Sequence, residues 1–341
     1  MKRISFFFAL IYTAFVCISC VGTNPRSSGR PFELLVVIEP QLWDAPAGQA
    51  IQATLDMDVP GLPQSEPSFR VMHAAPQHFD STLKLIRNVI VVEVSDKFTK
   101  GSFKSTKDLY ANSQVILTIQ APDAESLEAF VNENRAAIVS YFTRIEMNRQ
   151  IQTLEKSHSA RIDQLTDSLF GSHIWIPAEL QSYKVGQDFL WASTNAASGD
   201  RNVVIYSYPY TDKDTFTKDF FVRKRDSVMQ VNIPGYKEGV YMGTDSLLTT
   251  TKAISVQKEY AFEARGLWRM VGDFMGGPYV SHTRLDKTKN RIITAEVFVY
   301  SPDKMKRNLI RLMEASLYTL KLPGDSTATA IPLDMVNERT Q

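Results

Sequence analysis

The stretch from Asp123 to Phe170 constrains the fold most, because it contains neither glycine nor proline. Asp123 can cap the start of a helix, and Gly171 is a suitable residue at its end. The pattern predicts one long helix, about 70 Å long if unbroken at about 1.5 Å per residue. Its apolar stripe narrows in the second half, as in a spacer between domains or a partner helix. A hinge near Ser157–Ser159 is the alternative.

Strand patterns lie on both sides of this predicted helix. Before it, "PFELLVVIEP" (31–40) is a short apolar run between prolines, and further strands are expected at 69–75, 87–95 and 114–121. After it, apolar residues recur at every second position, for example over 254–263, as in antiparallel strands with one exposed face. We therefore expect an α+β fold with two sheet-containing halves, the second largely antiparallel, joined by a long central helix.

A faint internal repeat accompanies these strands. "RNVIVVEV" from Arg87 recurs as "RNVVIYSY" from Arg201, and "VILTIQAPD" from Val115 is similar to "VFVYSPD" from Val297. An internal duplication and chance similarity both remain open as explanations.

The first nineteen residues have the layout of a secretory signal peptide: a basic start, an apolar run too short to span a membrane, and a small residue, Ser19. Together with Cys20 they resemble the lipobox of bacterial lipoproteins, although Cys17 stands where leucine is usual. In that family the signal is removed and the cysteine is lipidated. Ordinary secretion with a cut near Ser19 is the alternative. No cysteine follows Cys20, which favours lipidation and excludes an intramolecular disulfide or a cysteine-based metal site in the mature chain.

The segment after Cys20 is small, polar and punctuated by proline and glycine, as in a flexible tether. The expected organisation is a signal peptide (1–19), a lipidated tether (20–30), an N-terminal α+β domain (31–122), the long helix (123–170), a C-terminal α+β domain (171–322) and a disordered tail (323–341).

Charge and motifs make several functions improbable. Lysine and arginine number 38 against 37 aspartate and glutamate, which leaves no electrostatic footprint for nucleic acid. The five histidines are dispersed, and neither a phosphate-binding glycine loop nor a nucleophile elbow is present. Two Ser-x-x-Lys matches, at 81–84 and 301–304, lack the Lys-Thr-Gly element of penicillin-binding enzymes. The motifs identify no catalytic residues, and we expect no metal and no cofactor.

One segment combines an unusual turn with binding-type side chains. Arg265, Trp268, Arg269 and Asp273 precede Gly276-Gly277-Pro278 and form the candidate binding surface. The favoured interpretation is structural: a hairpin with Trp268 buried and a positive φ at one of the two adjacent glycines.

Several segments together resemble an uncharacterised lipoprotein family of Bacteroidetes-type bacteria: the lipobox-like start, "FELLVVIEPQLWDAPAGQAI", "PGLPQSEPSFRV", "RNVIVVEV" and "RGLWRMVGDFMGGPYVSH". This resemblance covers nearly the whole mature chain and is to a domain of unknown function. It implies an exported, lipid-anchored envelope protein and carries over no catalytic residues. In such bacteria an acidic cluster after the lipidated cysteine suggests display outside the cell. Its absence here favours the periplasmic face of the outer membrane.

The expected function is therefore a non-enzymatic binding or scaffold protein, whose partners are the membrane, through the lipid, and an envelope protein or cell-wall component. The alternative is an envelope glycan or peptide hydrolase that uses aspartate and glutamate. A deep pocket with two carboxylates about 5–9 Å apart would favour the hydrolase, and a shallow aromatic surface would favour binding.

Overall fold

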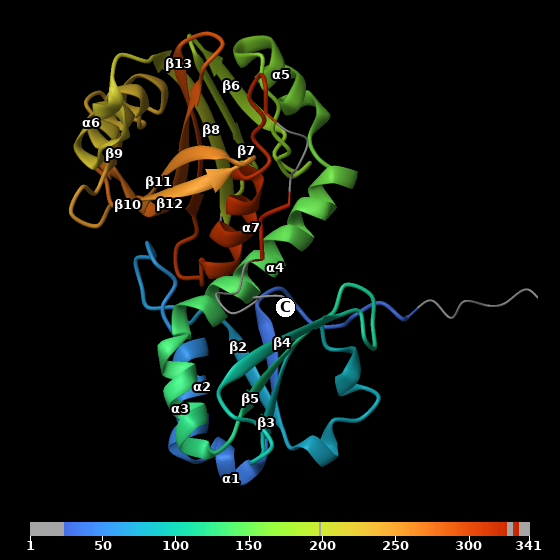
Figure 1. Ribbon diagram of the computed structural model, residues 1–341. Helices are drawn as coiled ribbons and strands as arrows, with labels where there is room; N and C mark the ends of the chain where they lie inside the picture. The colour runs from blue at the N-terminus through green and yellow to red at the C-terminus, as the bar shows by residue number, and fades with distance from the viewer. Residues whose placement is uncertain (1–23, 198, 326–329, 334–341) are drawn as a thin grey trace, which may run out of the picture.

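The computed structural model describes residues 24–197, 199–325 and 330–333. The predicted signal peptide and Cys20 lie outside these residues. Two sheet-containing halves are stacked with helix α4 (Arg135–Lys156) between them (Figure 1). The predicted α+β class, with a second half built on an antiparallel sheet, is confirmed.

The first half contains a five-stranded sheet in the order β2-β1-β3-β5-β4. Neighbouring strands pair in parallel except β4, which is antiparallel to β5. Runs such as "ELLVV" are apolar at successive positions because both faces of the sheet are covered. Helices cover one face, and short 3₁₀ turns cover the other. The elements are β1 (Glu33–Val37), α1 (Pro40–Trp43), α2 (Pro46–Leu55), β2 (Arg70–Ala74), η1 (Pro76–His78), η2 (Leu83–Leu85), β3 (Asn88–Val94), β4 (Ser102–Lys107), β5 (Val115–Ala121) and α3 (Ala124–Glu133).

The second half contains an eight-stranded antiparallel sheet in the order β10-β11-β12-β13-β8-β7-β6, with β9 also paired to β11. Helices α5 and α7 pack on one face and α6 packs on the other, so the central strands are buried on both sides. The elements are α5 (Ala160–Phe170), β6 (Ser182–Gly186), β7 (Phe189–Ser193), β8 (Asp200–Pro209), η3 (Lys213–Phe216), α6 (Lys218–Asn232), β9 (Tyr241–Thr244), β10 (Thr250–Val256), β11 (Glu259–Val271), β12 (Gly276–Asp286), β13 (Arg291–Tyr300) and α7 (Arg307–Leu317).

The alternation over 254–263 belongs to two strands rather than one. Gln257 and Lys258 have φ values of 55° and 65°, so the chain reverses there between β10 and β11. Two successive residues with positive φ form the turn type that suits the twist of a two-residue hairpin. Neither residue is glycine or asparagine, which is why the sequence did not reveal the turn.

The predicted continuous helix is wrong, and the alternative break near Ser157 is correct. α3 ends at Glu133, α4 ends at Lys156 and α5 begins at Ala160. At the second break Ser159 N donates to Ile176 O at 2.9 Å, so the backbone finds a partner outside the helix. The second half of the stretch also does not project from the body, because its thin apolar stripe packs into the core, for example at Leu154.

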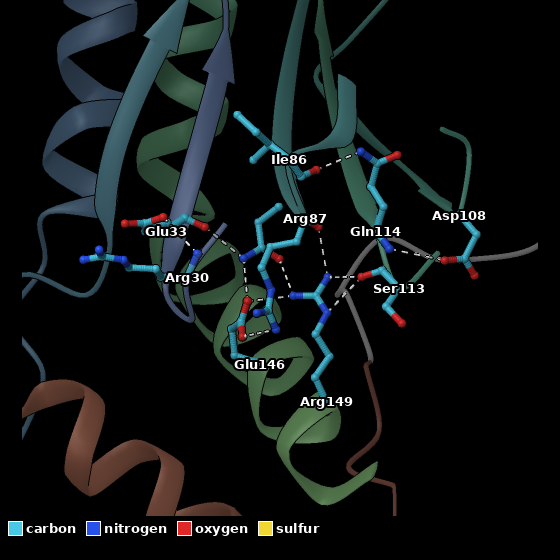
Figure 2. A network of polar contacts seen from close by, with 10 residues as sticks. Arg30, Glu33, Ile86, Arg87, Asp108, Ser113, Gln114, Glu146 and Arg149 are labelled. Atoms are coloured by element: carbon cyan, nitrogen blue, oxygen red, sulfur yellow. Dashed lines mark hydrogen bonds and ion pairs between the residues drawn. The ribbon is translucent and has the colours of Figure 1, made fainter. Parts of the chain in front are cut away.

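An ionic network ties α4 to the first sheet (Figure 2). The buried carboxylate of Glu146 accepts hydrogen bonds from Arg87 (2.8 Å), Asn88 (2.6 Å) and Arg149 (2.7 Å). Arg149 also donates to the backbone oxygen of Arg87 at 2.9 Å. Burial lowers the pKa of Arg149 to about 10, although the nearby Glu146 charge acts to raise it. The guanidinium therefore stays charged at neutral pH, and α4 is held to the first half by paired, buried charges.

Part of the predicted tether (20–30) pairs with neighbouring loops. Ser27 N donates to Asn112 O at 3.1 Å, Ser28 N donates to Leu85 O at 2.7 Å, and Asn112 N donates to Pro25 O at 2.8 Å. A polar segment with free backbone groups can pair with neighbouring loops, and here residues 25–28 do so.

The predicted disordered tail is also wrong for its described residues. Arg284 forms two hydrogen bonds with the carboxylate of Asp325, at 2.7 and 2.8 Å. Ile331 is buried, and its backbone exchanges two hydrogen bonds with the side chain of Asn148. These anchors come from α4 and β12, far away in sequence, so local composition did not indicate them.

The faint repeat does not extend to the topology. β3 and β5 are parallel neighbours, whereas β8 and β13, the matching segments, are antiparallel neighbours. The similar segments therefore form strands in both halves, but these strands are paired in different directions.

Candidate functional site

A cavity of about 740 Å³ lies between the two halves. Its walls come from the 57–60 loop, the first half of α4, β10 and tail residues 331 and 332, and its floor comes from β11 and α7. The cavity is therefore assembled from both halves and from the tail.

The floor carries a buried ion network. Glu263 and Arg265 lie on the same face of β11, because residues two apart in a strand point the same way. Arg265 Nε donates to Glu263 Oε1 at 2.8 Å, and its Nη2 donates to Glu314 Oε1 on α7 at 2.7 Å. One guanidinium thus bridges two carboxylates from different elements.

Charge pairing offsets the cost of burial in this network. Burial raises the pKa of Glu263, but the contacts with His282 and Arg265 outweigh it and hold that pKa below its usual range. Burial lowers the pKa of Arg265, but Glu314 and Glu263 outweigh it and hold that pKa above its usual range. Both groups are therefore charged at neutral pH.

His282 lies next to this network on β12, directly across from Glu263 in the strand register. Its side chain is fully buried, and its Nε2 is 3.7 Å from Glu263 Oε2. Among the described residues, neither ring nitrogen of His282 nor Glu263 Oε2 has a hydrogen-bond partner. The ring of Tyr318 meets the His282 ring edge to face at 4.8 Å. Donor atoms of Glu263, His282 and Glu314 all lie within 4.8 Å of one another.

Arg311 is a second buried cation beside the cavity. Its guanidinium lies 5.0 Å from the ring centre of Phe32 and 5.8 Å from that of Phe69, and it donates to Ser68 O at 2.8 Å. Burial lowers its pKa to about 10, partly offset by the Glu314 charge. Because Arg311 is on α7 and its neighbours are in the first half, it joins the two halves through cation–π contacts.

A helix cap from the other half fixes the position of α7. The buried carboxylate of Glu66 accepts from the backbone N–H of Lys306 at 2.8 and 3.0 Å and from that of Arg307 at 2.8 Å. A carboxylate satisfies the free N–H groups at a helix start and interacts favourably with the helix dipole. This cap holds α7, which forms part of the cavity floor, against the first half.

The four residues of the candidate binding surface do not lie on one surface. Arg265 points into the cavity, whereas Trp268 is buried on the opposite face of β11, where it packs on Phe298. Arg269 is exposed and Asp273 is partly buried in the turn that follows. Strand alternation separates positions 265 and 268, which are an odd number of residues apart. The predicted burial of Trp268 is confirmed, with 2% exposure.

The role expected for the paired glycines needs correction. The positive φ belongs to Gly272, at 83°, and neither Gly276 nor Gly277 has one. Both are strand residues that need the space. A Cβ on Gly277 would lie 2.1 Å from Val299 O and 3.0 Å from the Trp268 ring nitrogen. Close backbone approach, rather than turn geometry, requires glycine here.

Sequence reasoning missed Glu263, His282 and Glu314 as a group. The five histidines are dispersed in the sequence, so no motif distinguishes His282 from the others. The proximity of the three residues depends on the β11–β12 register and on where α7 packs. The sequence signal that was available is the pair of charged residues at 263 and 265 among the apolar residues in the middle of the strand.

Comparison with protein families divides the chain in two. Residues 27–155 match DUF8532 and residues 159–319 match DUF4837, each described as a domain of unknown function. Together the two matches cover nearly the whole chain. Their boundary falls in the break between α4 and α5. The expected relation to families of unknown function is confirmed, with two families where one was expected. A search of curated proteins finds no match.

Among the described helices, none is both long and apolar enough to cross a membrane.

Proposed function

We propose that this protein is a non-enzymatic lipoprotein, anchored through Cys20 on the periplasmic face of the outer membrane, that binds an extended segment of another envelope protein in its central cavity. The observation that carries the proposal is the free edge of β10, which forms one wall of that cavity.

The geometry of β10 supports strand addition. Six successive residues, 250–255, line the cavity. Side chains of a strand alternate between two faces, so a continuous lining run means that the strand presents its edge. Within the described residues β10 pairs only with β11, which leaves one row of backbone donors and acceptors unpaired. Extended peptides bind such edges through main-chain hydrogen bonds.

The charges of the lining favour an acidic segment. Four basic and three acidic side chains line the cavity. The basic ones are Arg144, Lys252, Arg265 and Arg311, and the acidic ones are Asp58, Glu263 and Glu314. The lining therefore carries one net positive charge, and Arg144 and Arg311 are cations of the lining that pair with no carboxylate in the described residues. A carboxylate on the bound segment would complement them.

One observation favours the alternative, an envelope hydrolase: two carboxylates, Glu263 and Glu314, line the same cavity. However, a general acid of a glycosidase needs a raised pKa, and the pKa of Glu263 is lowered. Both carboxylates also bond the same guanidinium. Binding is therefore the better-supported function.

The test places a photo-crosslinking amino acid at Ala253 on β10 in living cells, with Val231 on α6 as the control position. Val231 is 75% exposed and lies on the far side of the second sheet. We expect one specific cross-linked protein from position 253 and none from 231. A synthetic peptide of the cross-linked segment should then bind the purified chain and slow hydrogen exchange of the β10 amides. Equal cross-linking from both positions, or binding without protection of β10, would contradict the proposal.

A further inference from the structure

The strongest unassigned feature is the group formed by Glu263, His282 and Glu314. It joins three elements, β11, β12 and α7, and all three side chains are buried. An acidic pair alone would be explained by Arg265, which bridges the two carboxylates. His282 is not explained in that way, because a fully buried imidazole without a hydrogen-bond partner is costly.

We infer that Glu263, His282 and Glu314 bind a divalent transition-metal ion at the floor of the cavity, and that Zn²⁺ fits their donor set. Imidazole nitrogen and carboxylate oxygen are common zinc ligands, at about 2.0–2.2 Å from the ion. Two such ligands in tetrahedral geometry lie about 3.4 Å apart. The 3.7 Å between His282 Nε2 and Glu263 Oε2 is too long for a good hydrogen bond but close to this spacing.

Arg265 is compatible with the ion because it uses other atoms. It donates to Oε1 of both glutamates, so Oε2 of each carboxylate remains without a donor among the described residues. Two carboxylates and one guanidinium sum to one negative charge, which a divalent cation reverses to one positive charge. Lys252, which also approaches Glu263 Oε1 at 3.3 Å, is 61% exposed and can turn to solvent.

The site also has an open side. Glu263 and Glu314 line the cavity, so a fourth coordination position would face it. Three protein ligands with one open position let an ion hold a further group. A carboxylate of the bound segment has the required chemistry. This last point rests on the proposed function, whereas ion binding itself does not.

The test adds Zn²⁺ alone to the metal-free full chain at neutral pH and measures bound metal and affinity by equilibrium dialysis. His173→Ala is the control, because His173 forms an exposed group with Asp163 and Asp167 that could bind zinc adventitiously. We expect one Zn²⁺ per chain, an affinity loss of about 100-fold or more in His282→Ala, and no change in His173→Ala. No binding by the wild type, or loss in His173→Ala with His282→Ala unaffected, would overturn the inference.

A second measurement covers the case in which His282→Ala does not fold. X-ray absorption of zinc bound to the wild type should show one imidazole among oxygen ligands, and the absence of imidazole would overturn the inference. Zinc binding with no β10 cross-link would count against the proposed function only. A β10 cross-link with no zinc binding would count against this inference only.

Discussion

Trp268 shows how a single side chain can serve packing where its neighbours suggested recognition. Its ring contacts Phe298 and Tyr300, and its Nε1 donates to Val299 O at 3.2 Å. Trp268→Ala should lower the free energy of unfolding by about 3–5 kcal/mol, because a large buried ring is replaced by a cavity. Chemical denaturation measures the change. Arg269→Ala, at the exposed next position, should stay within about 0.5 kcal/mol. Similar losses of unfolding free energy in both variants would show that burial of the Trp268 ring is not the cause of the destabilisation.

Asp286 offers a pH-dependent test. Its carboxylate accepts from Thr288 N at 3.0 Å, Thr288 Oγ1 at 2.5 Å and Arg291 Nε at 3.1 Å. Burial raises its pKa, but these hydrogen bonds outweigh it and place the pKa below its usual range. A depressed folded-state pKa means that its stabilisation is present above the unfolded pKa, about 3.9, and is lost as pH falls through the folded value.

Asp286→Asn removes this charge but keeps one acceptor oxygen. We expect a loss of about 1–2 kcal/mol at pH 7 that shrinks toward zero as the pH drops below about 4. Thermal unfolding of both proteins from pH 2 to 7 measures the difference. A difference that does not change with pH would show that the carboxylate charge does not contribute.

Among the elements, the break between α4 and α5 gives the sharpest test. Ala160 is the first residue of α5, and the preceding Ser159 is extended, with φ −73° and ψ 96°. Proline suits the first helical position, and an extended residue suits the place before proline. Ala160→Pro should therefore change stability by less than about 0.5 kcal/mol. Gln164→Pro, exposed but inside α5, should cost about 3 kcal/mol. Equal losses would mean that the helix is continuous.

The cap provided by Glu66 links the two halves of the molecule. Glu66→Ala would leave two buried backbone N–H groups at the start of α7, those of Lys306 and Arg307, without an acceptor. We expect a loss of about 1–3 kcal/mol. We also expect calorimetry to show the two halves unfolding at more widely separated temperatures. Glu133→Ala, an exposed glutamate at the end of α3, is the control and should have little effect. If both variants behave alike, the cap does not couple the halves.

Anchorage concerns the molecule as a whole. Cys20→Ala should move the protein from the outer-membrane fraction to the soluble fraction or block its maturation, because lipid chains on Cys20 would supply the attachment. Fractionation after a high-salt wash, with Cys17→Ala as the control, measures this. A Cys20→Ala protein that still sediments with the outer membrane would contradict the lipoprotein hypothesis.

Patterns that act locally could be read from the sequence. Apolar runs and alternation predicted most strands, and two sheet-containing halves with the second antiparallel, because burial of one or both faces imposes a period on neighbouring residues. The burial of Trp268 followed from the same reasoning. The sequence is compatible with both a continuous helix and a break near Ser157, because the partner that the backbone finds at the break, Ile176 O, comes from a later segment.

The site depended on long-range contacts. The turn between β11 and β12 sets the register that places His282 across from Glu263. The packing of α7, capped by Glu66 from the other half, brings Glu314 to Arg265. No local sequence pattern encodes either of these two contacts, because each results from how elements far apart in the chain pack together. Composition and periodicity specified the layers of this protein, and the packing of its two halves created the cavity and the charges within it.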